Sequence, residues 1–181
     1  MNSAAPTENT TPNTTDVPVQ QFRQAMRELA GAVSIITVGD EYNRTGFVAT
    51  SVSSFSAEPP RIILCISLTS SSWAVLSKTH RFGVNFMREG EDAIASRFTG
   101  FGGIKGEARY EGAEWIGLPT GTQVLKDALA SIDCTLEESL ERHDHAIVIG
   151  KVESIRICDQ GSPLLWFKSK FYSMGGPVVT T

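Results

Sequence analysis

The chain has 181 residues, of which 41% are hydrophobic and 20% charged, and its formal net charge is -4. This length and composition indicate one globular domain with a substantial hydrophobic core. A nucleic-acid-binding surface normally shows a basic excess or a basic stripe, and the sequence has neither, so nucleic-acid recognition is excluded. No segment approaches the roughly 20 apolar residues that a membrane-spanning helix needs.

The N-terminal segment and the cysteines indicate the cellular compartment of the protein. The first 18 residues have no basic start and no apolar core, so we do not expect a secretory signal. The three cysteines, Cys65, Cys134 and Cys158, are widely spaced and odd in number, which argues against a disulfide framework. We therefore expect reduced cysteines in a cytoplasmic protein.

The N-terminal half is predicted to combine short helices with antiparallel strands. Residues 1–18 are rich in Thr, Asn and Pro and have almost no large apolar groups, so we expect a disordered tail. Phe22, Met26 and Leu29 recur at helical spacing, and Gly31 ends this helix. The elements expected next are a strand over 32–38, a turn over 39–44, a return strand over 45–54, a strand from Arg61 after Pro59-Pro60, a helix capped by Ser70, Ser71 or Ser72 and ending near His80, and a strand over 82–87.

Strands dominate the C-terminal half. We expect a helix over 91–98, an irregular Gly-rich segment over 99–124, and strands over 128–137, 145–157 and 164–171. Hairpins prevail over strand–helix–strand units, with about seven strands and three short helices in all. The sequence therefore predicts a mainly β fold, an antiparallel barrel with a few covering helices. We place this domain at 19–175, followed by a short C-terminal tail at 176–181.

The stretch from Gly46 to Asn85 carries many small hydroxyl side chains beside apolar strand residues. These hydroxyl residues are Thr50, Ser51, Ser53, Ser54, Ser67, Thr69, Ser70, Ser71 and Ser72. Because buried hydroxyl groups without partners are costly, the pattern indicates a wall that hydrogen-bonds a polar ligand. At a helix N-terminus, Ser70 to Ser72 would also offer backbone N–H groups to an anion, with a plain serine cap as the alternative.

Other catalytic and metal motifs are not satisfied. The run from Gly100 to Gly106 follows a helix and has Lys105 where G-x-G-x-x-G needs glycine, so we interpret it as a surface loop. His143 and His145 share a strand face, but only His80 remains as a third histidine, so no metal site is expected. A polar turn, or one histidine that faces a ligand pocket, are the two alternatives for this pair. No G-x-S-x-G is present, so a serine hydrolase is not supported.

Several segments, taken together and in order, resemble the flavin reductase family with the FMN-binding split barrel. They are FRQAMRELAGAVSIITV from residue 22, GFVATSVSSFSAEPPRIILCIS from 46, SSSWAVL from 70, FGVNF from 82, SRF from 96, GLP from 117, ALASIDCTL from 128, HDHAIVIGKV from 143 and PLLWFKSKFY from 163. No single segment is specific, and their joint order over residues 21–172 carries the resemblance.

The resemblance implies a homodimeric split barrel that binds FMN or FAD at the dimer interface. Such enzymes transfer a hydride from NADH or NADPH to the flavin, and many pass the reduced flavin to a separate monooxygenase. An alternative branch keeps the flavin bound and reduces a cobalt corrinoid, cob(II)yrinic acid a,c-diamide, in cobalamin biosynthesis. Hydride transfer between two cofactors depends on ring placement and charge stabilisation more than on acid–base groups, which agrees with the lack of a catalytic triad.

The resemblance also assigns roles by position. His145 would face the nicotinamide and the flavin as the catalytic residue. The residues implied to bind the flavin are Thr50, Ser51, Ser53 and Ser54 along the ring and ribityl chain, Cys65, Ile66 and Ser67 at the ring edge, Ser70, Ser71 and Ser72 at the phosphate, and also Phe82, Asn85, Ser96, Arg97, Phe98 and Tyr172. The chain departs from the family pattern at His143, Thr50, Lys168 and Lys170, which affects fine cofactor contacts and nicotinamide preference.

A non-catalytic function remains an alternative to the two reductase functions. A split-barrel module could bind flavin or heme without turnover, as a carrier or sensor. A purely structural protein would leave the hydroxyl-lined strands unexplained. The sequence does not discriminate FMN from FAD, NADH from NADPH, or one final electron acceptor from another.

Overall fold

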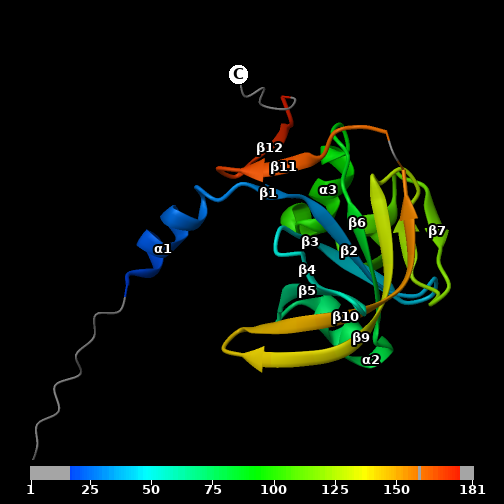
Figure 1. Cartoon of the computed structure of the whole chain (residues 1–181). Coiled ribbons are helices and arrows are strands. Elements are labelled where there is room, and N and C mark those ends of the chain that lie inside the picture. The colour runs from blue at the N-terminus through cyan, green and yellow to red at the C-terminus, as the bar shows by residue number, and fades with distance from the viewer. Residues whose placement is uncertain (1–16, 159, 176–181) are drawn as a thin grey trace, which may run out of the picture.

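The computed structural model describes residues 17–158 and 160–175, and within these ranges it contains three α-helices and twelve strands (Figure 1). The elements are α1 (Val19–Met26), β1 (Gly31–Ala32), β2 (Ser34–Gly39), β3 (Arg44–Ala49), β4 (Ser53–Ala57), β5 (Pro60–Ser67), α2 (Ser71–Thr79), β6 (Arg81–Phe86), α3 (Asp92–Phe98), β7 (Trp115–Gly117), β8 (Gln123–Leu125), β9 (Ala130–Arg142), β10 (His145–Ile157), β11 (Leu164–Phe167) and β12 (Lys170–Ser173). Two 3-10 helices, Phe101–Gly103 and Gly106–Tyr110, follow α3. The tails predicted at 1–18 and 176–181 lie outside the described residues, apart from Val17 and Pro18.

Seven strands form one curved sheet in the order β3-β2-β6-β9-β10-β5-β4. Every pairing between neighbours in this sheet is antiparallel. β3 and β4 form its two edges and do not pair with each other within the described ranges, so the barrel stays open along this seam. The prediction of a mainly β, antiparallel fold with few helices is confirmed.

Two strand predictions are wrong. The return strand expected over 45–54 is interrupted, because β3 pairs with β2 while β4 pairs with β5, and residues 50–52 carry the chain from one edge of the sheet to the other. The strand expected over 164–171 is a hairpin of β11 and β12. Lys168 and Ser169 turn the chain there with φ of 47° and 62°. The segment 99–124, expected to be irregular, also contributes β7 and the start of β8, which pair as a small hairpin.

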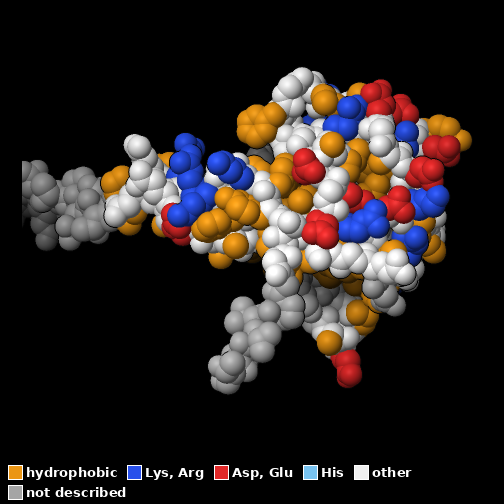
Figure 2. Space-filling model, turned by 90° about the horizontal axis from the view of Figure 1, so that it is seen from above, with side chains coloured by type: hydrophobic (Ala, Val, Ile, Leu, Met, Phe, Trp, Pro, Cys, Tyr) orange, Lys and Arg blue, Asp and Glu red, His pale blue; other side chains and the backbone are white. Residues whose placement is uncertain are grey.

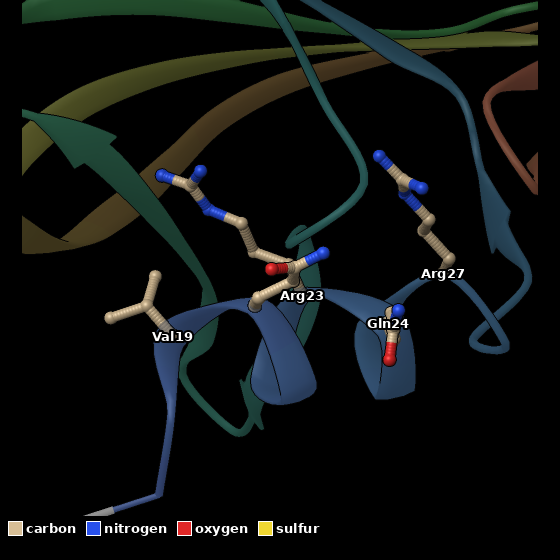
Figure 3. A pocket seen from close by; sticks show the side chains of 5 residues that line it. Val19, Arg23, Gln24 and Arg27 are labelled. Carbon is tan, nitrogen blue, oxygen red and sulfur yellow. The ribbon is translucent and has the colours of Figure 1, made fainter.

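The helices agree with the sequence in place, and α1 differs in its bounds. α1 covers Val19–Met26, so it ends before Leu29 and Gly31, where the sequence predicted its end, and it stands away from the body of the molecule (Figures 1 and 2). Its Arg23 and Arg27 project from one side of the helix (Figure 3). α2 begins after Ser70, whose hydroxyl accepts a hydrogen bond from Ser72 N–H, as a serine cap should. α2 ends at His80, which takes a left-handed conformation.

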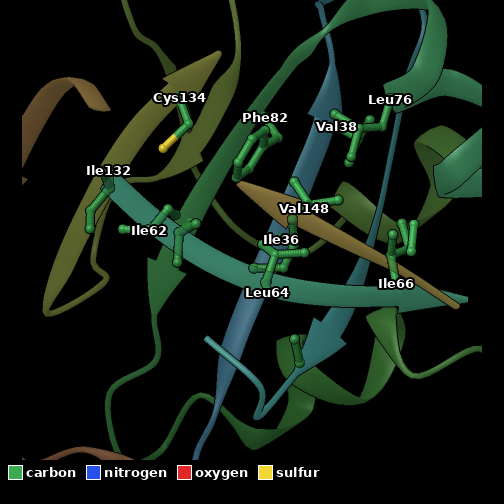
Figure 4. Close-up of a cluster of buried hydrophobic side chains, with 13 residues drawn as sticks. Ile36, Val38, Ile62, Leu64, Ile66, Leu76, Phe82, Ile132, Cys134 and Val148 are labelled. Atoms are coloured by element: carbon green, nitrogen blue, oxygen red, sulfur yellow. The ribbon is translucent and has the colours of Figure 1, made fainter. Parts of the chain in front are cut away.

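The main core fills the concave side of the sheet (Figure 4). Alternate residues of each strand point into it because side chains change sides at every position along a strand. In β5 these are Ile62, Leu64 and Ile66, and in β10 they include Ala146 and Val148. The intervening residues of both strands therefore lie on the outer side of the sheet.

A second core lies behind β2, between this strand and α3. β2 is buried along its whole length, with Ile36 and Val38 in the first core and Ile35 in the second. A strand that is buried on both sides needs apolar residues at consecutive positions, which explains the unbroken run of β-branched residues in the sequence. Because β2 is held between these two cores, its pairing with β3 fixes β3 at the open seam.

Candidate functional site

A cavity of about 400 Å³ lies at the open seam, between the end of β3 and the end of β5. Ten residues line it: Phe47, Val48, Ala49, Thr50, Ser51, Cys65, Ile66, Ser67, Ser70 and His145. Nine of the ten belong to the hydroxyl-rich part of the sequence, and His145 opens β10. The volume lies within the usual range for a small-molecule or cofactor site.

The turn after β3 forms one wall of this cavity. Its backbone is held by Ser51, whose Oγ accepts a hydrogen bond of 3.2 Å from the Cys65 N–H of β5. On its other side Thr50 is packed against Gly31, where an added Cβ would come within 2.9 Å of the threonine Cβ. The hydrogen bond of Ser51 crosses the seam to β5, and the contact of Thr50 comes from Gly31 of β1. Together they fix the positions of these two hydroxyl residues at the rim of the cavity.

The opposite wall runs from the end of β5 into α2. Ser67 Oγ lies 3.0 Å from Thr69 Oγ1 and also accepts a hydrogen bond of 3.4 Å from the Thr69 N–H. Ser70 then caps α2, the only helix whose N-terminus borders this cavity among the described residues. The Ser72 N–H is already bonded to the Ser70 hydroxyl and the Trp73 N–H to the Ser70 carbonyl, so it is the positive end of the helix dipole that favours an anion at this position.

His145 closes the third side. It pairs across the strands with Ser67, and its Nδ1 lies 2.9 Å from Asp144 Oδ1. The Asp144 carbonyl accepts a hydrogen bond of 3.0 Å from the Leu68 N–H, so the turn between β9 and β10 is tied to the segment that leads into α2. The hydrogen bond with His145 is the main reason why the pKa of the exposed Asp144 carboxyl is lowered. With Nδ1 engaged, Nε2 is the imidazole atom left for a ligand.

The cavity combines apolar surface with hydroxyl groups and lacks strong charge. None of the described residues that line it is lysine, arginine, aspartate or glutamate. Phe47 and Val48 supply apolar surface, while four hydroxyl residues, the α2 N-terminus and one imidazole supply the polar groups. Such a set suits a flat, largely apolar ring system with polar edges and an attached anion. The donors present therefore fit a flavin nucleotide.

Several residues assigned to the cofactor by resemblance are part of the cores instead of the cavity wall. Phe82, Asn85 and Phe98 are at most 1% exposed. The Asn85 side chain donates to Ile35 O (3.0 Å) and accepts from Leu125 N–H (2.7 Å). A side chain that is enclosed in this way has no access to the cavity of the same chain.

Other assigned residues lie elsewhere on the fold. Ser72 is fully buried and lies 3.4 Å from the Thr45 hydroxyl, and Ser71 is exposed on α2. Ser53 and Ser54 line a different, more apolar groove of about 330 Å³ beside β4. Ser96 bonds to Asp92 within α3, Arg97 bonds to the carbonyls of Ala108 and Arg109 and to Glu111, and Tyr172 is 44% exposed on β12. The structure thus gathers Thr50, Ser51, Cys65, Ile66, Ser67, Ser70 and His145 in one place and separates the rest from them.

Three cavity residues were not among those predicted, namely Phe47, Val48 and Ala49 of β3. In the sequence they are ordinary apolar strand residues, and the only available signal was their position directly before Thr50. Within residues 17–158 and 160–175, no group of three or more His, Cys, Asp or Glu side chains is placed to hold a metal ion. No helix in these ranges is long and apolar enough to cross a membrane.

Comparison with known proteins identifies the family. Residues 26–175 match the model of the flavin reductase like domain. The chain is 34% identical over 155 residues to "FMN reductase (NADH) RutF 2" of Rhizobium rhizogenes, covering 86% of this chain and 88% of that protein. It is 31% identical over 152 residues to the reductase subunit HsaB of a flavin-dependent monooxygenase of Rhodococcus jostii, covering 84% and 76%.

A solved structure agrees with this match. The crystal structure of a flavin reductase domain protein from Arthrobacter sp. FB24 superposes with a TM-score of 0.78 at 30% identity, covering 90% of this chain and 97% of that one. The chain therefore belongs to the flavin reductase like domain family, and the resemblance stated from the sequence is confirmed.

Proposed function

We propose that this protein is a flavin reductase that transfers a hydride from NADH to FMN and supplies the reduced flavin to a monooxygenase. The match of 150 consecutive positions, residues 26–175, to the flavin reductase like domain carries this proposal. Relatives named as NADH-dependent FMN reductases favour FMN and NADH over FAD and NADPH. A relative named as the reductase subunit of a flavin-dependent monooxygenase favours a monooxygenase as the next acceptor.

The residues that line the cavity can bind and orient the two rings, as this reaction requires. When bound, FMN provides an acceptor for the hydride of NADH, so the chain needs to bind and orient two rings. The apolar side chains of Phe47 and Val48 offer surface for a ring, and the hydroxyl groups of Thr50 and Ser51 offer hydrogen bonds to its polar edge. Backbone N–H groups and hydroxyl groups at that edge stabilise negative charge without any proton transfer.

Two tasks remain, to bind the flavin phosphate and to orient the nicotinamide, and they fall to opposite ends of the cavity. Ser70 and the N-terminal end of α2 hold the flavin phosphate, because this helix N-terminus is the positive end of a dipole. His145 orients the nicotinamide through Nε2, because Asp144 holds its Nδ1. Neither role requires the histidine to donate or accept a proton during the reaction.

We also infer a cytoplasmic homodimer with the flavin at the subunit interface. Partly exposed apolar residues on the outer side of β5 and β10, including Ile63, Ile147 and Ile149, support an interface next to the cavity. The three cysteines are free in the structure, which supports a reducing compartment.

The activity is tested with the full chain, FMN and NADH, by following the nicotinamide absorbance. We expect NADH oxidation that needs both the protein and added FMN. A tight flavin complex without NADH oxidation would instead indicate a carrier or sensor. If neither FMN nor FAD supports oxidation of NADH or NADPH, the proposed function is wrong.

The phosphate position is tested by replacing Ser70 with alanine and comparing FMN with riboflavin, which lacks the phosphate. We expect the KM for FMN to rise roughly five-fold, while the KM for riboflavin changes less than about two-fold. Ser77→Ala is the matched control, because Ser77 is exposed on the same helix and lies outside the cavity. Equal effects on both flavins would contradict the assignment of Ser70 to the phosphate.

A further inference from the structure

A groove of about 230 Å³ lies between α1 and the hairpin of β11 and β12. The chain at the end of α1 is joined to the turn of this hairpin at two points. The Lys168 N–H donates a hydrogen bond of 3.3 Å to Arg27 O, and Lys168 Nζ lies 3.0 Å from Glu28 Oε2. A second hollow of about 430 Å³ adjoins the groove, because Arg23 and Arg27 line both (Figure 3). The groove shares no residue with the cavity proposed for FMN, so the proposed function leaves it without a role.

One side of the groove is apolar and aromatic. Trp166 of β11 lines it, together with Phe22 and Met26 of α1, which are 58% and 47% exposed. The Trp166 ring is held in place by the Phe171 ring, at a centroid distance of 4.9 Å in an edge-on arrangement. Because nucleobases stack on aromatic side chains, this surface suits a flat heterocyclic ring.

The other side of the groove is basic. Arg23 and Arg27 lie one turn apart, and their guanidinium groups project from the same side of the helix (Figure 3). Neither side chain forms a hydrogen bond or an ion pair with a residue that the structure describes, whereas Lys168 is already paired with Glu28. Figure 2 shows basic side chains beside hydrophobic ones on this projecting helix. Because unpaired guanidinium groups bind phosphate oxygens well, the ligand expected here joins a ring to phosphate.

The groove and the cavity are neighbours. Trp166 of the groove pairs with Gly31 of β1, and Gly31 packs directly against Thr50 at the rim of the cavity. Paired residues on adjacent antiparallel strands have Cα atoms about 5 Å apart, so a single residue separates the two sites. None of the described residues that line the cavity is lysine or arginine. NADH carries two phosphates and an adenosine besides its nicotinamide, and the groove offers the cations and the aromatic surface that suit these parts.

We propose that this groove binds the adenosine diphosphate half of NADH, with the adenine ring against Trp166 and Phe22 and the pyrophosphate between Arg23 and Arg27. The inference rests on the proposed function and extends it, because the cavity by itself accounts only for the flavin and the nicotinamide. The nicotinamide half of the dinucleotide then passes Gly31 and enters the cavity at its rim. In this arrangement α1 is part of the substrate site, although it lies outside the sheet that forms the cavity.

Binding is tested first with ADP, without flavin or hydride donor, by isothermal titration calorimetry on the full chain. We expect Arg23→Gln/Arg27→Gln to raise the Kd for ADP roughly ten-fold, and inorganic pyrophosphate, which has no ring, to bind roughly five-fold more weakly than ADP or worse. Lys78→Gln/Lys105→Gln is the matched control, since it removes the same charge at two exposed positions outside the groove. Wild-type protein that does not bind ADP, an equal loss in the control variant, or equal affinities for ADP and pyrophosphate would overturn the proposal.

Steady-state kinetics then compares NADH with dihydronicotinamide riboside, which lacks the whole adenosine diphosphate half. At saturating FMN, we expect Arg23→Gln/Arg27→Gln to raise the KM for NADH roughly ten-fold, to change the KM for the riboside less than about two-fold, and to leave kcat unchanged. An equal rise for both donors, or no rise for NADH, contradicts the assignment of the groove. The ADP titration involves no hydride transfer, so the groove can fail this test while NADH oxidation persists, and NADH oxidation can fail while ADP still binds.

Discussion

Replacing Asn85 with alanine should destabilise the fold by about 3 kcal/mol and leave the KM for FMN unchanged. The family resemblance places Asn85 at the cofactor, whereas the structure encloses it completely. Its amide links three elements, because Nδ2 donates to Ile35 O in β2 and Oδ1 accepts from the Leu125 N–H of β8 and the Ser131 hydroxyl of β9. The substitution therefore separates a structural role from a binding role.

The magnitude follows from these three hydrogen bonds. Without Oδ1, the buried Leu125 N–H loses its acceptor, and an unsatisfied buried donor costs about 1–3 kcal/mol. Ser131 keeps a longer contact of 3.5 Å to Leu125 O, and the bond to Ile35 O adds about 1 kcal/mol. For a chain of this size, a loss of about 3 kcal/mol lowers Tm by roughly 10 °C.

Urea unfolding at one fixed protein concentration measures the effect, since the proposed homodimer would couple stability to concentration. We expect a lower midpoint with an unchanged slope. Ser51→Ala is the control with the opposite pattern: its hydrogen bond to Cys65 N–H is exposed, so stability falls by less than about 1 kcal/mol while the KM for FMN rises. An Asn85→Ala variant with wild-type stability and weakened FMN binding would refute the reasoning and place Asn85 at the cofactor.

Three further predictions concern the seam, the thiols and the hairpin turn. Gly46→Ala should cost about 3 kcal/mol in the free energy of unfolding, because its Cβ would lie 2.5 Å from Ile36 O; a calorimetric Tm within 2 °C of wild type would contradict this. Cys65, exposed in the cavity, should react with a thiol reagent and be protected by FMN, whereas burial raises the pKa of the Cys134 thiol, which should react only after unfolding. Because the pKa of Asp144 is lowered, its stabilising effect is present above the usual aspartate pKa of about 4 and is lost as the pH falls through the lowered value; urea unfolding in pH steps should show this loss for wild type and not for Asp144→Asn.

Strand prediction succeeded where local pattern and tertiary structure agree. β10 covers His145–Ile157, the bounds predicted from its alternating residues, and both sides of that alternation are used. β9 extends to Arg142, beyond the predicted end at residue 137. Residues 138–142 show little alternation, and they form a strand because β10 pairs with them as far as the turn at His143. Pairing imposed by a partner strand leaves no periodic signal in the sequence.

The site was predicted in part for a comparable reason. The hydroxyl groups of Ser51, Ser67 and Ser70 stood out because such groups are unusual beside apolar strands. Phe47, in contrast, could not be distinguished from core residues such as Phe82, because an aromatic strand residue suits a core and a cavity wall equally well. The curvature of the sheet decides between them, since it leaves β3 at an open edge and closes β6 inside.

Core and cavity share the same strands, and this couples stability to binding. In β5, Leu64 points into the main core while the next residue, Cys65, lines the cavity and donates its N–H to Ser51. Because strand backbones are short and closely packed, a change in the volume of Leu64 moves the Cys65 backbone as well. The cavity wall is therefore positioned by the core behind it, whereas Ser70 and His145 are positioned by turns outside that core. Substitutions in the core should consequently affect the side of the cavity formed by β5 more than the side formed by Ser70 and His145.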